Sequence, residues 1–152
     1  MDVASQVASP DVRGVFFNFL VPGAPFAVTP ALYQVGLAAR QNLRNAYQAM
    51  MESQQLDGFI FPTTILPARP IGQDLVVQLN GQNVPTLLTY TQNLVPAAYA
   101  GLAGLSLPIG LTIDGLPVGL EIDGLEGSDE QVLGIGLSLE KAFGRMPPPS
   151  LP

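Results

Sequence analysis

Two neighbouring stretches decide the fold of this chain: Leu105-Ser106-Leu107-Pro108-Ile109 and, a few residues later, Leu116-Pro117-Val118-Gly119-Leu120-Glu121-Ile122. Between these two mainly apolar runs lies Asp114-Gly115, a dipeptide that accepts the positive backbone φ angles of a tight turn. We therefore predict a β-hairpin. Pro108 has no N–H to donate to a neighbouring strand, so we expect it at a sheet edge or at a bulge.

The residues before this hairpin are apolar and uncharged. Residues 94–113 are 20 positions without Asp, Glu, Lys or Arg, which is long enough to cross a bilayer. Two prolines interrupt the stretch, three glycines dilute it, and no basic residue between Arg69 and Lys141 anchors it at a membrane surface. We expect a buried core segment with a short helix over residues 96–101, and no membrane partner.

Two longer helices are predicted around this segment. Thr29 can cap a helix whose first turn contains Pro30, and apolar residues recur at helical spacing from there to residue 54. Arg40 and Arg44 fall one turn apart on another face of this helix. Such a pair is more typical of a solvated edge than of an anion clamp.

The second helix follows the hairpin. Ser128 and Gln131 fit the capping box of a helix N-terminus, and the pattern predicts a helix to about Phe143, where Gly144 can end it. Apolar residues surround most of its circumference, so we expect this helix to be buried on more than one side.

Shorter elements precede and separate these helices. Phe59-Ile60-Phe61, ended by Pro62, is a continuous apolar run typical of a strand buried on both faces. Residues 75–79 and 82–84 flank Asn80-Gly81, the dipeptide most favourable for a two-residue hairpin turn. Near the N-terminus, the apolar run over residues 15–21 predicts a short buried element.

The composition indicates a protein surface that other protein covers. Of 152 residues, 47% are hydrophobic and only 12% are charged, against about 25% charged in an average soluble domain. We therefore expect part of the surface to face other protein. The net charge of −6 and the scattered basic residues make nucleic acid a poor partner. The N-terminal residues lack the basic segment and apolar run of a secretory signal, which favours a cytoplasmic protein.

Missing residue types exclude much catalytic chemistry. Without histidine or cysteine, this chain holds no Ser/His/Asp triad, thiolate nucleophile, disulfide, or zinc site with nitrogen or sulfur ligands. Its one lysine, Lys141, falls in the last turn of a predicted helix, where the helix dipole stabilises the charged amine, so we expect a structural role and no general base. No serine lies in a glycine-flanked elbow. We predict no catalytic residue, metal site or cofactor in this chain.

Two groups of side chains remain as candidates for a site. Glu121 and Asp123 fall on one face of the predicted strand, where paired carboxylates can perform acid–base chemistry or bind a divalent ion; a solvent-facing strand end explains them too, and we favour that interpretation. Thr63 and Thr64 follow the predicted strand at the end where open α/β sheets commonly bind ligands. Hydroxyl pairs also cap loops. From the residues alone, a ligand-binding role and a loop-capping role of the two threonines are equally supported.

Longer motifs resemble a known family. Residues 93–110, followed by Asp114-Gly115-Leu116-Pro117-Val118-Gly119-Leu120-Glu121-Ile122, resemble the C-terminal portion of amidase signature enzymes. Upstream, Asp57-Gly58-Phe59-Ile60-Phe61-Pro62-Thr63-Thr64 is similar to the family's element of an aspartate, hydrophobic residues and Pro-Thr. Order and spacing agree over roughly residues 30–144. The details look most similar to the branch that hydrolyses arylacetamides such as mandelamide and indoleacetamide.

This resemblance implies a fold, an activity and a site. The fold is α/β, the C-terminal part of an α/β/α sandwich with a mixed β-sheet flanked by helices. The activity is hydrolysis of carbon–nitrogen amide bonds through an acyl-serine. The serine nucleophile, the bridging serine in a cis peptide and the lysine base of the family have no counterpart in residues 1–152, so this chain alone is expected to be inactive. The substrate-binding residues that the resemblance implies are Thr63, Thr64, Thr91, Asn93 and Pro96. Ser106 matches a family position and is expected to hydrogen-bond to backbone.

The resemblance also divides the chain and names its partners. We expect a lead segment rich in proline and glycine over residues 1–29, the amidase portion over 30–144 and a proline-rich tail over 145–152. The expected partners are the catalytic N-terminal portion of an amidase, or a second copy of the chain, and a small-molecule amide. The alternatives are a non-catalytic remnant or assembly module with the same partial fold, and a small-molecule binding domain that uses the hairpins as its pocket.

Overall fold

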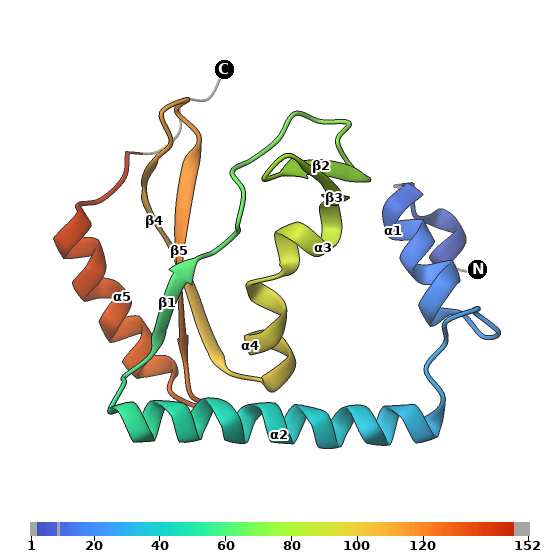
Figure 1. Cartoon of the computed structure of the whole chain (residues 1–152), viewed down its shortest axis with the longest axis horizontal. Coiled ribbons are helices and arrows are strands. Elements are labelled where there is room, and N and C mark those ends of the chain that lie inside the picture. The colour runs from blue at the N-terminus through green and yellow to red at the C-terminus, as the bar shows by residue number, and fades with distance from the viewer. Residues whose placement is uncertain (1–2, 9, 148–152) are drawn as a thin grey trace. The chain divides into compact units, whose positions relative to one another are not determined.

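The computed structural model describes residues 3–8 and 10–147, in two compact units over residues 1–39 and 40–152 (Figure 1). The proline-rich tail expected over residues 145–152 lies outside the described residues from 148 onward. The elements follow one another as η1 (Val3–Gln6), α1 (Pro10–Val15), η2 (Phe16–Leu20), α2 (Pro30–Gln54), β1 (Phe59–Pro62), β2 (Val76–Leu79), β3 (Gln82–Pro85), α3 (Thr86–Thr91), α4 (Leu94–Ala100), β4 (Ala103–Leu111), β5 (Pro117–Gly124) and α5 (Asp129–Phe143).

The first unit is helical and poorly covered. The apolar run over residues 15–21 folds as the end of α1 and the π-helical segment η2, and its side chains Phe17, Phe19 and Leu20 are exposed. The prediction of a buried element was therefore wrong. Phe19 packs on Phe26 with ring centroids 5.5 Å apart. The described residues of this unit provide no layer large enough to cover the run.

Helix α2 confirms the predicted range. Its start is fixed by Thr29, whose Oγ1 accepts a hydrogen bond from the Leu32 N–H at 3.2 Å, and by Pro30, whose missing N–H costs nothing in a first turn. Residues 40–54 of the helix belong to the second unit, where Met51 is buried. Tyr47 contacts the ring of Phe59 edge-on at 5.6 Å.

A three-stranded antiparallel sheet forms the centre of the second unit, in the order β1-β5-β4. The predicted hairpin joins β4 and β5, with Gly115 at φ 79° in its turn. Pro108 lies where the register shifts between Pro108 and Gly110, on an edge strand. Both parts of the prediction for this proline are thereby confirmed, because the irregularity removes the need for a donor at that position.

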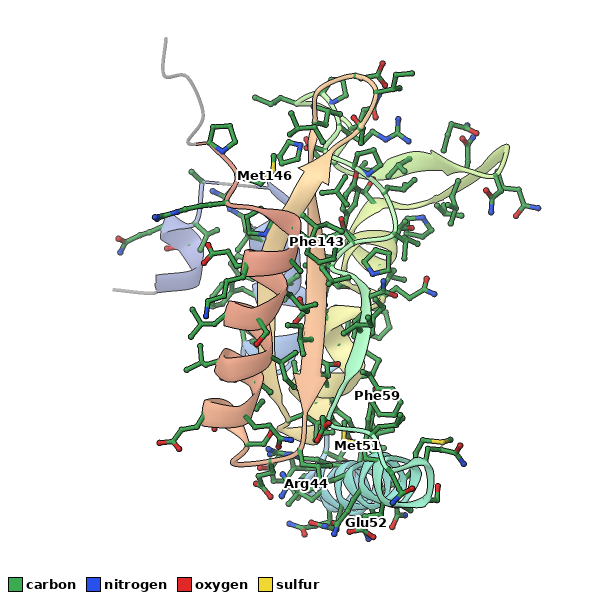
Figure 2. The ribbon with its side chains drawn as sticks, turned by 90° about the vertical axis from the view of Figure 1, so that its left-hand side faces the viewer. Arg44, Met51, Glu52, Phe59, Phe143 and Met146 are labelled. Carbon is green, nitrogen blue, oxygen red and sulfur yellow. The ribbon has the colours of Figure 1, made fainter. Side chains whose placement is uncertain are left out.

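Helix α5 covers one face of β4 and β5, as Figure 2 shows. The buried centre of this layer consists of Ala103, Leu107, Ile122 and Val132. Gly136 allows the close approach, since a Cβ there would overlap the side chain of Leu105. Removing these apolar side chains from water stabilises the fold at about 25 cal/mol per Å².

Two details predicted for α5 were wrong. Ser128 and Gln131 form no capping box: the Ser128 hydroxyl donates to the Leu125 carbonyl and the Gln131 amide donates to Asp57. The helix is buried on one side only, with Leu133 and Leu137 54% and 60% exposed. Gly144, at φ 82°, ends the helix as predicted.

Strand β1 differs from its prediction in burial. It pairs with β5 through one edge, and Ile60 is 60% exposed. Strand β1 lies at the edge of its sheet, and a helix layer covers one face of that sheet. An edge strand in this position has too few neighbours to be buried on both faces. Among the described residues no further strand pairs with the outer edge of β1.

The segment between β1 and β4 holds the second hairpin and two short helices. Strands β2 and β3 pair around Asn80 and Gly81, whose φ angles of 50° and 79° confirm the predicted turn. Helix α4 confirms the predicted short helix and ends at Gly101, at φ 74°. Helix α3 was not predicted, because three of its six residues are threonine and one is tyrosine, which favour strands.

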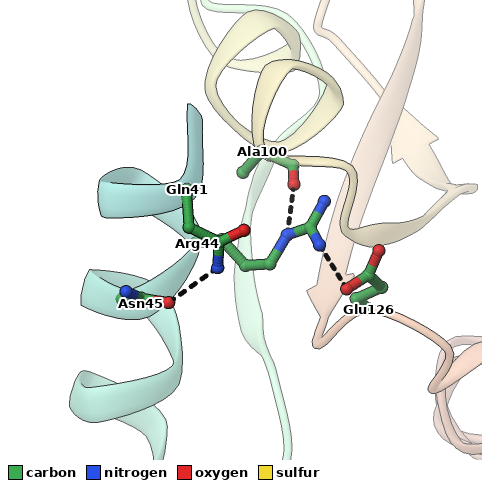
Figure 3. A network of polar contacts seen from close by, with 5 residues as sticks. All are labelled: Gln41, Arg44, Asn45, Ala100 and Glu126. Atoms are coloured by element: carbon green, nitrogen blue, oxygen red, sulfur yellow. Dashed lines mark hydrogen bonds and ion pairs between the residues drawn. The ribbon is translucent and has the colours of Figure 1, made fainter. Parts of the chain in front are cut away.

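Arg44 does not lie on a solvated edge. Its side chain is 19% exposed, its Nε donates to the Ala100 carbonyl at 2.9 Å, and it forms an ion pair with Glu126 (Figure 3). Arg44 thus ties α2 to the end of α4 and to the loop after β5.

In the described part of the chain, no helix combines the length and the apolar character that a membrane crossing requires.

Candidate substrate-binding surface

Two hydroxyl groups meet where β1 ends. The Thr63 N–H continues the β1–β5 pairing by donating to the Gly119 carbonyl at 2.9 Å, which points the threonine side chain across the sheet. Its Oγ1 lies 2.5 Å from the Ser106 Oγ on β4. A Cβ at Gly119 would lie 2.7 Å from Thr63 Oγ1 and 3.0 Å from Ser106 Oγ, so the glycine provides the space for this hydroxyl pair. The predicted backbone bond of Ser106 was wrong, because Thr63 is its partner.

Glu121 sets the direction of this hydrogen-bond chain. Thr63 donates a side-chain hydrogen bond to the Glu121 carboxylate, which opposes the rise that burial causes in the pKa of Glu121. A threonine hydroxyl has one proton, so when Thr63 donates to Glu121 it must accept from Ser106. The Ser106 oxygen then keeps its lone pairs as free acceptors.

Two open cavities lie where β1 ends, and the hydroxyl pair lines one of them. One, of about 310 Å³, is lined by Thr63, Thr64 and Ser106 together with residues of the β4–β5 hairpin. The other, of about 210 Å³, shares Thr64 and adds Ile65, Leu66 and Pro67 of the loop that follows β1. The Thr64 hydroxyl donates to the Leu66 carbonyl at 2.8 Å and so holds that loop.

The other predicted site residues approach this surface to different degrees. The Asn93 amide donates to the Pro62 carbonyl at 2.7 Å, which ties the α3–α4 junction to the end of β1. The Thr91 hydroxyl bonds to the Leu87 carbonyl within α3, and Pro96 lies in the first turns of α4. Thr91, Asn93 and Pro96 are not among the residues that line the two cavities. The structure therefore brings together Thr63 and Thr64, and Asn93 lies next to them through its bond to Pro62.

Sequence reasoning missed the character of the acidic pair. Glu121 and Asp123 project from the face of β5 opposite Ile122, yet Asp123 is 1% exposed and Glu121 is partly buried. The expected solvent-facing strand end was wrong. The signal that could have found them is their register, because their cross-strand neighbours Ser106 and Gly104 are small. Side chains from other elements can then lie near the carboxyl groups, as Thr63 does at Glu121 and Tyr47 at Asp123.

Burial changes the protonation of this cluster. It raises the pKa of Asp123 to about 6, with the negative charge of Glu121 as the second cause. Burial also raises the pKa of Tyr47, and the nearby Asp123 charge adds to that rise. Two carboxyl groups lie close together in this cluster, and a low-dielectric environment disfavours charging both of them.

The one lysine of the chain lies on the opposite side of the sheet from Ser106. Ser106 has Thr63 as its neighbour, while Lys141 is exposed near the end of α5, which covers the other face of the sheet. Within residues 3–8 and 10–147, no three His, Cys, Asp or Glu side chains are grouped so as to hold a metal ion. The described arrangement can orient a polar ligand through hydroxyl and amide groups.

Comparison with known proteins finds relatives along nearly the whole length of the chain. The chain is 45% identical over 93% of its length to an indoleacetamide hydrolase from Agrobacterium vitis, and 33% identical over 98% of its length to a mandelamide hydrolase from Pseudomonas putida. It spans 30% of the length of each relative. A crystal structure of an amidase matches 92% of the chain at a TM-score of 0.74 and 28% identity, again over 30% of that protein.

The profile of the amidase family matches residues 24–133, which contain the hydroxyl pair, both hairpins and the whole three-stranded sheet. The α/β architecture agrees with that of the matched amidase structure. On this match, and on the relatives that share nearly its whole length, the chain belongs to the amidase family.

Proposed function

We propose that this chain is the C-terminal part of an enzyme that hydrolyses the amide bond of small arylacetamide-type substrates. The observation that carries the proposal is the 45% identity to an indoleacetamide hydrolase over 93% of the chain but 30% of the relative. The acyl-serine chemistry belongs in this proposal to the remaining portion of the enzyme, because the described residues offer no activated nucleophile.

The contribution of this chain is a wall of the substrate cleft. Thr63 and Thr64 supply hydroxyl groups beside two cavities, and Asn93 holds the neighbouring α3–α4 junction against β1. Ser106, with free acceptor lone pairs, suits the N–H group of an amide or an indole ring. Thr91 and Pro96 are proposed to border the acyl side of the substrate, as in the family pattern.

A hybrid enzyme tests this function. The matching 30% of the Agrobacterium vitis indoleacetamide hydrolase is replaced by this chain, and ammonia release from indole-3-acetamide is measured for the hybrid and for residues 1–152 alone. We expect turnover by the hybrid and none by the chain. Turnover by the chain alone would place the nucleophile within it and overturn the proposal.

Two variants of the hybrid test the site. Thr63→Val removes a hydroxyl at nearly constant volume and is expected to raise KM and lower kcat, whereas Thr91→Val removes a hydroxyl used within α3 and is expected to affect activity less. A folded hybrid that does not hydrolyse arylacetamides would favour the non-catalytic assembly module.

A further inference from the structure

We propose that Asp123 and Glu121 form the docking point for a lysine or arginine side chain that is carried by the portion of the amidase outside these 152 residues. The inference rests on the proposed function, because that function requires a catalytic portion to pack against this chain. It goes beyond it by assigning the acidic pair a partner of stated chemistry, a cation that contacts both carboxyl groups.

The isolation of Asp123 is the first observation. Its side chain is 1% exposed, and neither of its carboxylate oxygens has a hydrogen-bond partner within the described residues. The Oε2 atom of Glu121 is also buried and unpartnered. Native proteins pair nearly all buried polar atoms, and buried charges in particular. Two adjacent carboxyl groups with unpaired oxygens therefore indicate a missing donor.

Gly104 provides the approach to these oxygens. It is exposed and lies opposite Asp123 in the β4–β5 register, with no side chain to cover the carboxyl groups. A Cβ at Gly104 would lie 3.3 Å from Glu121 Oε1 and 3.5 Å from Asp123 Oδ1, with no other atom beyond the neighbouring residues within 4 Å. A donor nitrogen that enters over Gly104 therefore meets both carboxyl groups.

The described part of the chain forms no ion pair at this position. Among the described residues the ion pair found is that of Arg44 with Glu126, and none involves Asp123 or Glu121. The chain spans 30% of its relatives' length, so the larger part of the enzyme is available to cover this face. A guanidinium or ammonium group suits two carboxylates, whereas a metal ion would need further ligands, which the described residues do not bring together here.

The decisive experiment compares Asp123→Asn in two contexts, residues 1–152 alone and the hybrid with the Agrobacterium vitis enzyme. In the chain alone the substitution removes an unpaired buried charge, and we expect the Tm at pH 7 to rise. In the hybrid it removes one partner of a buried ion pair, and we expect the Tm to fall. Asp74→Asn, in an exposed loop, is the matched control and should leave both Tm values nearly unchanged.

A second pair of variants keeps the proposal testable if the hybrid does not fold. In residues 1–152, Gly104→Lys places a cation beside the two carboxyl groups, and Gly104→Met adds an uncharged chain of similar length. We expect the lysine variant to have the higher Tm and the lower pKa of Asp123, measured by NMR titration. Equal Tm and pKa values in the two variants would overturn the proposal.

The outcomes separate this inference from the proposed function. A hybrid that hydrolyses indole-3-acetamide but is stabilised by Asp123→Asn would overturn the inference and leave the function intact. An inactive hybrid that is destabilised by Asp123→Asn would support the inference and contradict the proposed function. If CaCl₂ or MgCl₂ raises the Tm of residues 1–152 and this rise is lost in Asp123→Asn, the occupant is a metal ion and the proposed side chain is wrong.

Discussion

The carboxyl group of Asp123 gives the isolated chain an unusual dependence of stability on pH. The folded state keeps its proton up to about pH 6, whereas the unfolded state releases it near pH 3.8. The folded state therefore binds more protons between these values, and the free energy of unfolding falls as the pH rises through this interval. From this group we expect a loss of about 2–3 kcal/mol between pH 4 and pH 7.

Urea unfolding at several pH values measures this loss. In Asp123→Asn the decrease between pH 4 and pH 7 should largely disappear, with a smaller remainder from Glu121, whose pKa is also raised. A wild-type chain that becomes more stable from pH 4 to pH 7 would contradict the burial of an unpaired Asp123.

Arg44 and Glu126 should contribute unequally although they form one ion pair. Glu126 is 57% exposed, so Glu126→Gln is expected to cost less than about 0.5 kcal/mol of unfolding free energy. Arg44→Met also leaves the carbonyl of the buried Ala100 without its donor and is expected to cost about 1–3 kcal/mol. Equal losses in urea unfolding would mean that the ion pair with Glu126, and not the bond to the Ala100 carbonyl, accounts for the contribution of Arg44.

At the level of elements, α5 offers a matched comparison of two glycines. A Cβ at Gly136 would overlap Leu105, whereas a Cβ at Gly134 would meet nothing within 4 Å. Gly134→Ala should therefore stabilise the chain by up to about 1 kcal/mol through helix propensity, and Gly136→Ala should destabilise it by about 1–3 kcal/mol through overpacking against β4. Thermal unfolding of both variants measures the difference. A gain in Gly136→Ala would show that α5 does not rest on Leu105.

The elements that could be predicted from the sequence are those that neighbouring residues determine. Asn80, Gly81 and Gly115 adopt positive φ angles that their residue types favour, and Thr29 and Pro30 suit a helix start, so both hairpins and α2 were predicted correctly. The family motifs also indicated Thr63 as a site residue, and in the structure it lines one of the two cavities. These features need no knowledge of tertiary contacts.

The wrong predictions concern features that depend on distant residues. The Gln131 side chain bonds to Asp57 instead of completing a capping box, and the exposure of Ile60 reflects a missing neighbour of β1. The burial of Asp123 depends on side chains from other elements, which no pattern within β5 reveals. The partner of Ser106 is Thr63, 43 residues away, and only the sheet register brings the two together.

For the whole molecule, the exposed apolar surface has a measurable consequence. Leu133 and Leu137 lie one turn apart on the outer side of α5 and are mostly exposed. The isolated chain should bind a hydrophobic dye such as ANS, and replacing both leucines by glutamine should lower this binding while changing the free energy of unfolding by less than about 1 kcal/mol. A loss comparable to that of a core substitution, about 2–5 kcal/mol each, would show that α5 is buried on this side within the chain.

The space beside Gly119 makes the evolution of this surface depend on the order of mutations. The hydroxyl groups of Thr63 and Ser106 already fill the volume that an alanine side chain at position 119 would need. The effects of substitutions at residues in contact are strongly coupled. A library randomised at positions 63, 106 and 119 should therefore contain alanine at 119 only in clones that lack the hydroxyl group at position 63 or at position 106. Those clones would also have broken the chain of donors that ends on Glu121, so a lineage that once accepts alanine at 119 needs two compensating steps to recover the original arrangement.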